Sequence, residues 1–473
     1  MPTPTTNRHH IHWPRARREW RATLRLALPL IGAQLAAMGT NVVDALLAGH
    51  MGPHVQAAVT TGASVWSLAI LAGIGTMLAV PPTVAQLDGA GRRHEIGAVI
   101  RQALWIAAVL GVVLWLFVRN AEPLLNMIGV VPSLRHDVGA FLGAVAWGAP
   151  ALAGYFALRG LSEGLSLPRP SMFFSLMGLA ILAPLDYVLM YGPGDLPALG
   201  ALGSGIATAI TLWLEFIGFA TYILLHRNYR GIGLLERFDW PRWKVISELL
   251  HLGVPMAVSV MMEGGIFVAV ALAIATLGVE QEAAHQVALN VSAVAFMIPL
   301  GLAMAITIRV GNAVGRGDAT GVRYAGFCGI SLALVTQLVS ASLMLLLPYA
   351  IARLYTGDDS VIALAAQLLV LAGIFQFSDG IQVASNGALR GLKDTRVPMF
   401  ITAFAYWGVG MPVGLWLAFE HGLGARGMWM GLIAGLSVAA VLLFTRWWRS
   451  ARSERWRRQV PDAPLPDAPG VIT

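Results

Sequence analysis

Long apolar stretches alternate with short polar segments along the whole chain of 473 residues. An apolar run of about 18 residues or more can cross about 30 Å of hydrocarbon as a helix. The pattern predicts twelve such helices, at residues 24–48, 56–86, 95–118, 137–160, 170–191, 198–226, 253–276, 281–309, 323–347, 360–389, 397–419 and 426–447. We therefore expect an all-α integral membrane protein, because the alternating pattern of a membrane β-barrel is absent.

The composition supports this class. Only 12% of the residues are charged and 57% are hydrophobic, and the mean hydropathy is +0.68. Soluble domains carry about 25% charged residues. The single Cys328 excludes an intrachain disulfide framework and a cysteine-based metal site. We expect the first apolar run to be a retained helix and not a cleaved signal peptide, because it is long enough to span.

Lysine and arginine gather on one side of the predicted membrane. With the N-terminus inside, only four of the 32 fall outside, namely Arg119, Arg135, Arg353 and Arg426. Basic residues mark the cytoplasmic side, so both termini are expected in the cytoplasm. This bias accounts for most of the net charge of +7, which favours anionic lipid, and nucleic-acid binding is not needed to explain it.

The second half of the chain repeats the first. "LALPLIGAQL" from Leu26 resembles "LGVPMAVSVM" from Leu252, and "LRGLSEGLSLPRPSM" from Leu158 resembles "LRGLKDTRVPM" from Leu389. Two parallel six-helix repeats about an axis along the membrane normal are typical of transporters. The predicted parts are a cytoplasmic N-terminal tail 1–23, an N-terminal lobe 24–226, a cytoplasmic linker 227–252, a C-terminal lobe 253–447 and a basic cytoplasmic tail 448–473.

Five acids lie inside predicted spans, while no span has a lysine or arginine near its centre. They are Asp44, Asp186, Glu215, Glu263 and Asp379. Intramembrane acids usually mark ion or proton paths, although a protonated acid can also make a structural hydrogen bond. For Glu215 the structural interpretation is favoured. For Glu263 and Asp379, each near mid-span, we favour a cation site.

Neighbouring residues in the second half fit such a site. Phe267 lies on the same helix face as Glu263, where an aromatic ring suits a cation, although packing is the commoner role of one phenylalanine. Gln286 and Asn290, also four residues apart, offer neutral ligands or simple bridges between helices.

The first half has a carboxyl pair of its own. Asp44 and Asp186 are expected at similar depth, toward the outer ends of their helices. Two adjacent carboxyl groups would bind a proton or a cation. Pro29 and Pro184 precede them on the same helices and are candidate hinges, since proline frees a backbone carbonyl.

From residue 20 to 445 the sequence resembles the multidrug and toxic compound extrusion (MATE) family, most closely its NorM branch. The resemblance rests on "NVVDALLAG", "VAQLDGAGR", "ALRGLSEG", "MMEGGIF", "AAHQVALNVSAVAFMIPLG", "IRVGNAVGRGD" and "SDGIQVASNGALRGLKDT" in this order. It implies a V-shaped pair of lobes that exports organic cations against inward Na⁺ or H⁺. It also implies a Na⁺ site at Glu263 and Asp379, an N-lobe acid at Asp44, and substrate contacts at Phe267, Gln286, Asp358 and Asp359.

The sequence departs from the NorM pattern at two places. A family tyrosine one turn before Asp379 is Phe375 here, which removes a hydroxyl from the cation site. A pair of asparagines on helix 5 is replaced by Leu182 and Asp186, and an aspartate there is similar to the proton-coupled DinF-like branch. We hypothesise that both lobes bind the coupling ion, with Na⁺ mainly at Glu263 and Asp379, and H⁺ at Asp44 and Asp186.

The expected function is a multidrug efflux antiporter that exports lipophilic cationic drugs and dyes in exchange for inward Na⁺, H⁺ or both. As the resemblance implies, we expect a monomer in a bacterial inner (plasma) membrane, without a cofactor. We expect no enzyme, because no His-Glu-x-x-His zinc motif occurs. One alternative is a flippase of lipid-linked saccharides, whose pyrophosphate cargo would require buried arginine or lysine. Another is a membrane receptor without transport.

Overall fold

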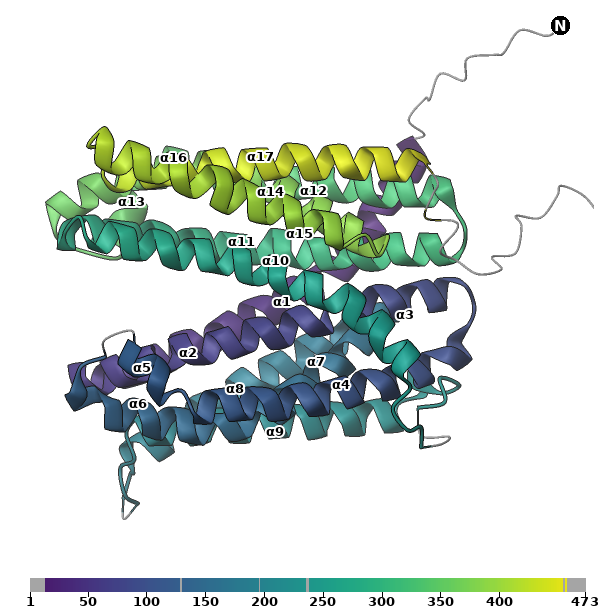
Figure 1. Ribbon diagram of the computed structural model, residues 1–473, viewed down its shortest axis with the longest axis horizontal. Coiled ribbons are helices and arrows are strands. Elements are labelled where there is room, and N and C mark those ends of the chain that lie inside the picture. The colour runs from purple at the N-terminus through teal and green to yellow at the C-terminus, as the bar shows by residue number, and fades with distance from the viewer. Residues whose placement is uncertain (1–12, 128–129, 195, 235–237, 454–455, 457–473) are drawn as a thin grey trace, which may run out of the picture.

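The computed structural model describes residues 13–127, 130–194, 196–234, 238–453 and 456, so residues 1–12 of the predicted tail 1–23, and 454–455 and 457–473 of the predicted tail 448–473, lie outside it. The described chain folds into helices: α1 (Trp13–Met51), α2 (Pro53–Met77), α3 (Val80–Gly89), α4 (Arg93–Arg119), α5 (Glu122–Met127), α6 (Pro132–Val145), α7 (Ala149–Gly164), α8 (Arg169–Tyr191), α9 (Ala201–Leu225), α10 (Trp243–Ala275), α11 (Val279–Gly315), α12 (Ala319–Leu346), α13 (Pro348–Arg353), α14 (Asp359–Gly391), α15 (Arg396–Ala403), α16 (Met411–Leu415) and α17 (Ala425–Ser453). Figure 1 shows their arrangement.

The twelve predicted spans are confirmed. Twelve helical segments of the described chain are long and apolar enough to cross a membrane, and each overlaps one predicted range. Two helices begin earlier than their apolar runs. α1 begins at Trp13 and α10 at Trp243, inside the segment predicted as a linker. The extra turns of α1 are polar, and one of their residues, Arg15, forms an ion pair with Asp318 at 2.9 Å.

The helices form two lobes, each around its own buried core (Figure 1). The core of the first lobe contains Trp66, Phe141 and Phe219, and that of the second contains Trp429 and Trp447. Burial of such side chains is the main stabilising contribution within each lobe, at about 1.5–3 kcal/mol per large apolar side chain. The result confirms the predicted two-repeat, all-α architecture.

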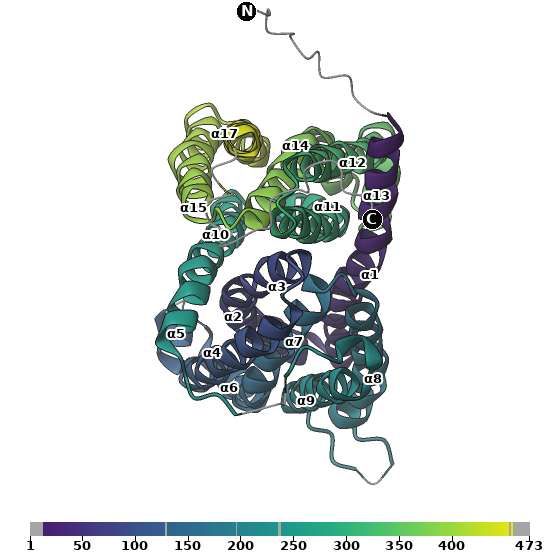
Figure 2. The same ribbon diagram turned by 90° about the vertical axis from the view of Figure 1, so that its right-hand side faces the viewer.

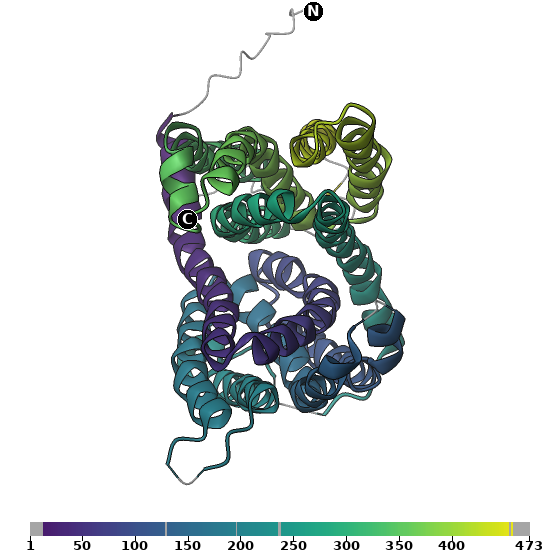
Figure 3. The ribbon, with the colours of Figure 1, turned by 90° about the vertical axis from the view of Figure 1, so that its left-hand side faces the viewer.

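Two helices cross from one lobe to the other. Figures 2 and 3 show α1 and α10 on opposite sides of the molecule, each spanning both lobes. The first half of α1 packs in the second lobe, where Ala27 and Leu30 are fully buried. Reciprocally, Ile246 and Leu249 at the start of α10 are buried in the core of the first lobe. The lobes are therefore connected by α1 and α10, each of which packs in both lobes, as well as by a loop.

The internal repeat is visible in the backbone. Gly52 and Gly278, at equivalent places before α2 and α11, have φ values of 117° and 121°. Gly91 and Gly317 follow α3 and α11 with φ values of 72° and 67°. These angles are open to glycine and costly for other residues, so the repeated glycines are required by the repeated turns.

The lobes also touch reciprocally, in a contact that we call the interlobe latch. A Cβ on Gly89 would collide with the backbone of Asn312, and a Cβ on Gly315 would collide with the backbone of Gln86. Both amides bridge the lobes: Gln86 Nε2 donates to the Gly391 carbonyl at 2.9 Å, and Asn312 Nδ2 donates to Ser166 Oγ at 3.0 Å. The latch lies at the end of the molecule where α1 begins and α17 ends, which we call the arginine-rich end.

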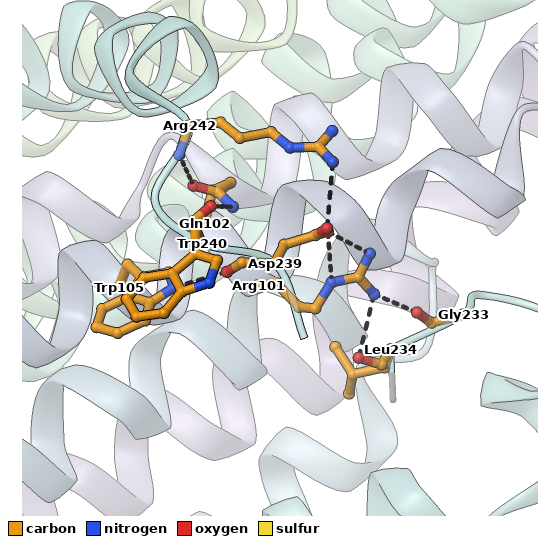
Figure 4. A network of polar contacts seen from close by, with 8 residues as sticks. All are labelled: Arg101, Gln102, Trp105, Gly233, Leu234, Asp239, Trp240 and Arg242. Carbon is orange, nitrogen blue, oxygen red and sulfur yellow. Dashed lines mark hydrogen bonds and ion pairs between the residues drawn. The ribbon is translucent and has the colours of Figure 1, made fainter. Parts of the chain in front are cut away.

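The segment between the lobes is fastened to α4 (Figure 4). Asp239 accepts from Arg101 Nε at 2.8 Å, and Arg101 also donates to the Gly233 and Leu234 carbonyls. Gln102 bonds the Trp240 carbonyl, and Trp105 Nε1 donates to the Asp239 carbonyl. Because Asp239 is buried, these charge-assisted bonds keep the segment with the first lobe, and α10 carries the connection onward.

Candidate functional site

A cavity of about 540 Å³ lies between the two lobes. Its walls come from α1, α2, α3, α7, α10, α11 and α14, so both lobes contribute. Most of the lining is apolar and includes the flexible side chains Met77, Met297 and Met304. The size falls in the range of about 300–1,000 Å³ that small-molecule sites occupy.

Two acids of the second lobe face this cavity. Glu263 projects from α10 and Asp379 from α14, and both line the cavity. Asp379 is 2% exposed, and its Oδ2 has no hydrogen-bond partner among the described residues. A buried carboxylate without a donor is unfavourable, so this pair is suited to a cation or a proton.

Neutral polar groups surround the pair, and two of them were missed in the sequence. Gln382, three residues after Asp379 on α14, lines the cavity, and neither side-chain amide atom has a partner in the described chain. Ser292 Oγ on α11 is likewise unpaired and lines the cavity. The spacing of Asp379 and Gln382 is the signal that could have identified the glutamine, since residues three apart share a helix face.

Aromatic rings form one side of the acid pair. Phe267 lines the cavity as predicted, and its ring centroid lies 6.1 Å from that of Phe375. Phe375 continues the contact to Trp429 at 5.8 Å, whose Nε1 donates to the buried His285 at 3.1 Å. His285 is thus a packing residue of the second-lobe core.

Tyr406 lies within electrostatic range of Glu263 and Asp379 and was not anticipated. It is 1% exposed, and its hydroxyl has no hydrogen-bond partner in the described chain. Tyr406 belongs to a π-helical segment, Phe404–Gly410, and π-helical turns recur at functional sites. Pro412 favours this widened turn because it has no N–H to donate to Gly408.

Two arginines also reach the cavity, which corrects the expectation that only acids face it. Arg159 and Arg390 occupy the same place in the repeated "LRGL" motif, and each lines the cavity from its own lobe. The prediction failed because it judged arginines by the position of their Cα near a helix end. A long arginine side chain extends well beyond that position.

The two arginines differ in their partners. Arg159 Nε donates to Glu163 Oε1 at 2.6 Å, and its NH2 donates to Gln34 Oε1 at 2.8 Å. Glu163, which was not considered from the sequence, is 2% exposed, so this is a buried ion pair. Arg390 has no such partner within hydrogen-bond distance in the described chain and lies within electrostatic range of Glu263. Glu215 on α9 packs against Gly178 and lies within electrostatic range of Arg159.

The acids of the first lobe form a separate site outside the central cavity. Asp44 on α1 and Asp186 on α8 lie close enough for their carboxyl groups to interact. Asp44 Oδ1, both Asp186 oxygens and Ser204 Oγ have no hydrogen-bond partner among the described residues. Two facing carboxylates cannot donate to each other, so the pair is stable only with a shared proton or cation.

Four predicted substrate residues lie away from the cavity lining. Gln286 and Asn290 are exposed on α11, where Gln286 Nε2 donates to Glu282 at 2.6 Å. Asp358 and Asp359 are at the start of α14, about 30 Å along the helix from Asp379. Bonds from the hydroxyl and N–H of Ser360 lower the pKa of Asp358, which caps the helix. Their contact with substrate stays a prediction.

The two candidate hinges lie within continuous helices. Pro29 is inside α1 at the crossing between the lobes, and Pro184 is inside α8 two residues before Asp186. Within the described residues, no three His, Cys, Asp or Glu side chains are grouped so that they could hold a metal ion.

A serine-hydrolase motif is present in the sequence, although it was overlooked. Gly160–Gly164 reads Gly-Leu-Ser-Glu-Gly, which matches Gly-x-Ser-x-Gly. Ser162 lies inside helix α7, where its hydroxyl donates to the Leu167 carbonyl at 2.7 Å and contacts Tyr229 Oη at 2.7 Å. The strand-to-helix turn that exposes a nucleophilic serine is missing at this position.

The fold and this cavity define a multi-pass helical membrane protein with two related lobes around a central chamber. The chain belongs to the MatE family, whose model matches residues 29–188 and 255–416. It is 48% identical to the probable multidrug resistance protein NorM of Xanthomonas campestris, covering 93% of this chain and 96% of that one. It is 42% identical to the multidrug resistance protein PmpM of Pseudomonas aeruginosa, covering 95% and 96%.

Solved structures share the fold. The eukaryotic MATE transporter AtDTX14 superposes with a TM-score of 0.85 at 21% identity, over 94% of this chain and 100% of that one. An outward-facing multidrug resistance MATE transporter of the MOP superfamily has a TM-score of 0.85 at 18% identity, over 92% and 97%. These likenesses confirm the predicted MATE-like fold.

Proposed function

We propose that the chain is a multidrug efflux antiporter of a bacterial inner membrane. It exports lipophilic organic cations in exchange for inward Na⁺, H⁺ or both, by alternating access of its two lobes. The observation that carries the proposal is the interlobe cavity, in which Glu263 and Asp379 face an otherwise mostly apolar wall. The names of the NorM and PmpM relatives support a multidrug cargo.

Antiport follows from competition for the acid pair. Charged carboxylates are unfavourable in a cavity of low dielectric constant, and a drug cation, Na⁺ or protonation relieves that cost. If these occupants exclude one another, an ion that enters from outside displaces the drug outward. The membrane potential favours the inward charge by about 2.3 kcal/mol per 100 mV. Apolar, Met-containing walls accept many drug shapes because methionine adapts its conformation.

The latch supports an outward-facing conformation. Gln86 and Asn312 join the lobes at the arginine-rich end, which we take as cytoplasmic from the distribution of Lys and Arg. Both termini then lie in the cytoplasm, and the cavity is sealed from that side. Transport requires that the latch open when the opposite end closes.

The coupling ions are assigned to different lobes. Glu263 and Asp379, with the unpaired Gln382 and Ser292 beside them, offer several oxygens to Na⁺. Asp44 and Asp186 offer a carboxyl pair without donors, which suits a single proton. Both sites serve one export cycle in this proposal.

Arg159 and Arg390 are the observation that favours the flippase alternative, because a pyrophosphate cargo needs such cations. Arg159 is neutralised by the buried Glu163. Of the other charged lining residues, Arg390 is one cation and Glu263 and Asp379 are two acids, so the lining remains acidic on balance. A cationic cargo is the better match.

Efflux of a fluorescent lipophilic cation from proteoliposomes tests the proposal, with a Na⁺ gradient at equal pH or a pH gradient without Na⁺. Glu263→Gln is expected to slow Na⁺-driven efflux about tenfold or more, because a charge-assisted ligand is lost. Asp44→Asn is expected to abolish only the proton-driven part. Glu122→Gln removes an exposed acid and serves as the control. Unchanged transport in Glu263→Gln, or movement of a pyrophosphate lipid instead, would overturn the proposal.

A further inference from the structure

A second cavity, of about 520 Å³, lies at the arginine-rich end of the second lobe. It is formed by the turn between α14 and α15, the first half of α10 and the last turns of α17. Its lining carries the basic side chains His251, Lys393, Arg396, Arg446 and Arg449, and one acid, Asp394. This cavity shares no residue with the lining of the central cavity.

Part of this charge is already paired. Arg446 Nε donates to Asp394 Oδ2 at 2.8 Å, and Arg396 contacts His251 Nδ1 at 2.9 Å. The side chains of Lys393 and Arg449 make no hydrogen bond or ion pair in the described chain. Burial lowers the pKa of Lys393 to about 8 although the charge of Glu248 acts in the opposite direction, so a further anion beside the ammonium would stabilise its charged form.

Lys393 occupies a backbone conformation that glycine adopts more easily, so the presence of a lysine there calls for an explanation. Its φ of 58° is left-handed, a conformation that is unfavourable for residues other than glycine. Bonds from Lys393 N–H to the Arg390 carbonyl and from Asp394 N–H to the Leu389 carbonyl hold this turn. The equivalent turn of the first lobe holds Ser166 at a φ of 60°, and its hydroxyl accepts from Asn312. Both lobes therefore contain this turn, but only the second lobe places a lysine in it.

The surroundings indicate where an anion would come from. Phe400, one turn after Arg396 on α15, is 65% exposed, and Trp448, beside Arg449 on α17, is 38% exposed. α15 begins one segment that is long and apolar enough to span a membrane, and α17 forms another, so exposed apolar side chains on them are expected to contact lipid. A tryptophan beside basic residues at the end of a span is typical of the head-group region.

We propose that this pocket binds the phosphate of an anionic phospholipid head group, with Lys393 and Arg449 as its ligands. Basic pockets between membrane helices on the cytoplasmic side bind such head groups. The phosphate satisfies the two free cations, and the acyl chains lie along Phe400 and Trp448. The inference needs only a membrane location and is independent of the cargo.

Native mass spectrometry tests the proposal on the full chain, purified with phosphatidylglycerol and phosphatidylethanolamine in equal amounts. The double variant Lys393→Gln/Arg449→Gln is expected to retain phosphatidylglycerol about tenfold or more weakly, because two charge-assisted bonds are lost. Arg316→Gln removes an exposed charge at the same end of the molecule and is expected to bind like the wild type. Melting in phosphatidylethanolamine alone checks that each variant is folded.

The pH dependence supplies a second readout. Lys393 faces Glu248 and His251 of α10, Asp394 and Arg396 of its own turn, and Arg446 and Arg449 of α17. As the pH rises from 7 to 9, Lys393 loses its proton and lipid retention falls. The single variant Lys393→Gln has no ammonium to lose its proton, so this fall in lipid retention is expected to be absent from it. Comparison with the wild type at each pH shows the contribution of Lys393. Equal retention of phosphatidylglycerol by the wild type and the double variant would overturn the proposal. It would also be overturned if free inorganic phosphate without lipid raised the melting temperature as much as phosphatidylglycerol does.

Discussion

Tyr406 shows how a single residue can restore what another position lacks. By the resemblance, Phe375 stands where the family has a tyrosine, and the unpaired Tyr406 hydroxyl belongs to a residue within electrostatic range of Glu263 and Asp379. A buried hydroxyl without a partner costs about 1–3 kcal/mol. We propose that this cost is relieved when the hydroxyl contributes to the occupied cation site.

Replacing Tyr406 by Phe tests whether the hydroxyl is a ligand of the cation site or only a structural group. Loss of a ligand is expected to weaken Na⁺ stimulation of transport about tenfold, at about 1–1.5 kcal/mol per hydrogen bond. The melting temperature without Na⁺ is expected to stay the same or rise, because an unpaired buried group is removed. Na⁺ titration of efflux and thermal unfolding measure the two effects. A higher melting temperature with unchanged Na⁺ dependence would show that the hydroxyl is only structural.

The sequence predicted acids better than it predicted their surroundings. Glu263, Asp379 and Phe267 stand out because they interrupt an apolar run or share its helix face, and the structure brings them to one cavity. Arg159, Glu163 and Arg390 sit at helix ends, where a charged residue is ordinary. Only the three-dimensional reach of their side chains places them in the cavity. Tyr406 comes from a different helix, α15 to α16, which no local pattern connects to α10.

Among the helices, α3 and α11 are the elements whose contact closes the cavity. Gly89 and Gly315 let their backbones approach, and Gln86 and Asn312 bond across the contact. The offset that relates Leu26 to Leu252 in the sequence repeat also relates Gly89 to Gly315, so the repeat makes these glycines equivalent. It could not show that each packs against the partner of the other, because that contact depends on how the lobes are placed.

Gly315→Val is expected to open the latch. A side chain there meets the Gln86 carbonyl and the Ala90 nitrogen, and overpacking costs about 1–3 kcal/mol. The open population rises about fivefold or more. Labelling of Asn386→Cys, which lines the cavity, with an impermeant maleimide in inverted vesicles measures this, after Cys328 is replaced.

Gly139→Val on α6 is the matched control, because a Cβ added at Gly139 would meet no atom within 4 Å. Labelling equal to that of the parent protein is expected for this control. If Gly315→Val also left labelling unchanged, the latch would not be the cytoplasmic seal.

At the scale of the whole molecule, two related lobes enclose one chamber, and two helices exchange between them. The spans follow from the lengths of the apolar runs, and the repeat follows from matching motifs, so the sequence was sufficient for both. The exchange of α1 and α10 was not predictable, because an apolar helix face does not specify which lobe it will meet. In the proposed transport cycle, the lobes would rock while they remain attached at both crossings.

The central claim is that drug and coupling ion compete for one site at Glu263 and Asp379. The most direct test is binding of a fluorescent organic cation to the purified protein in nanodiscs during Na⁺ titration at constant pH and ionic strength, with choline as the replacement ion. The account predicts that the apparent Kd of the dye rises in proportion to Na⁺ concentration, and that Glu263→Gln removes this dependence. A dye affinity that is independent of Na⁺, or that increases with it, would contradict the account.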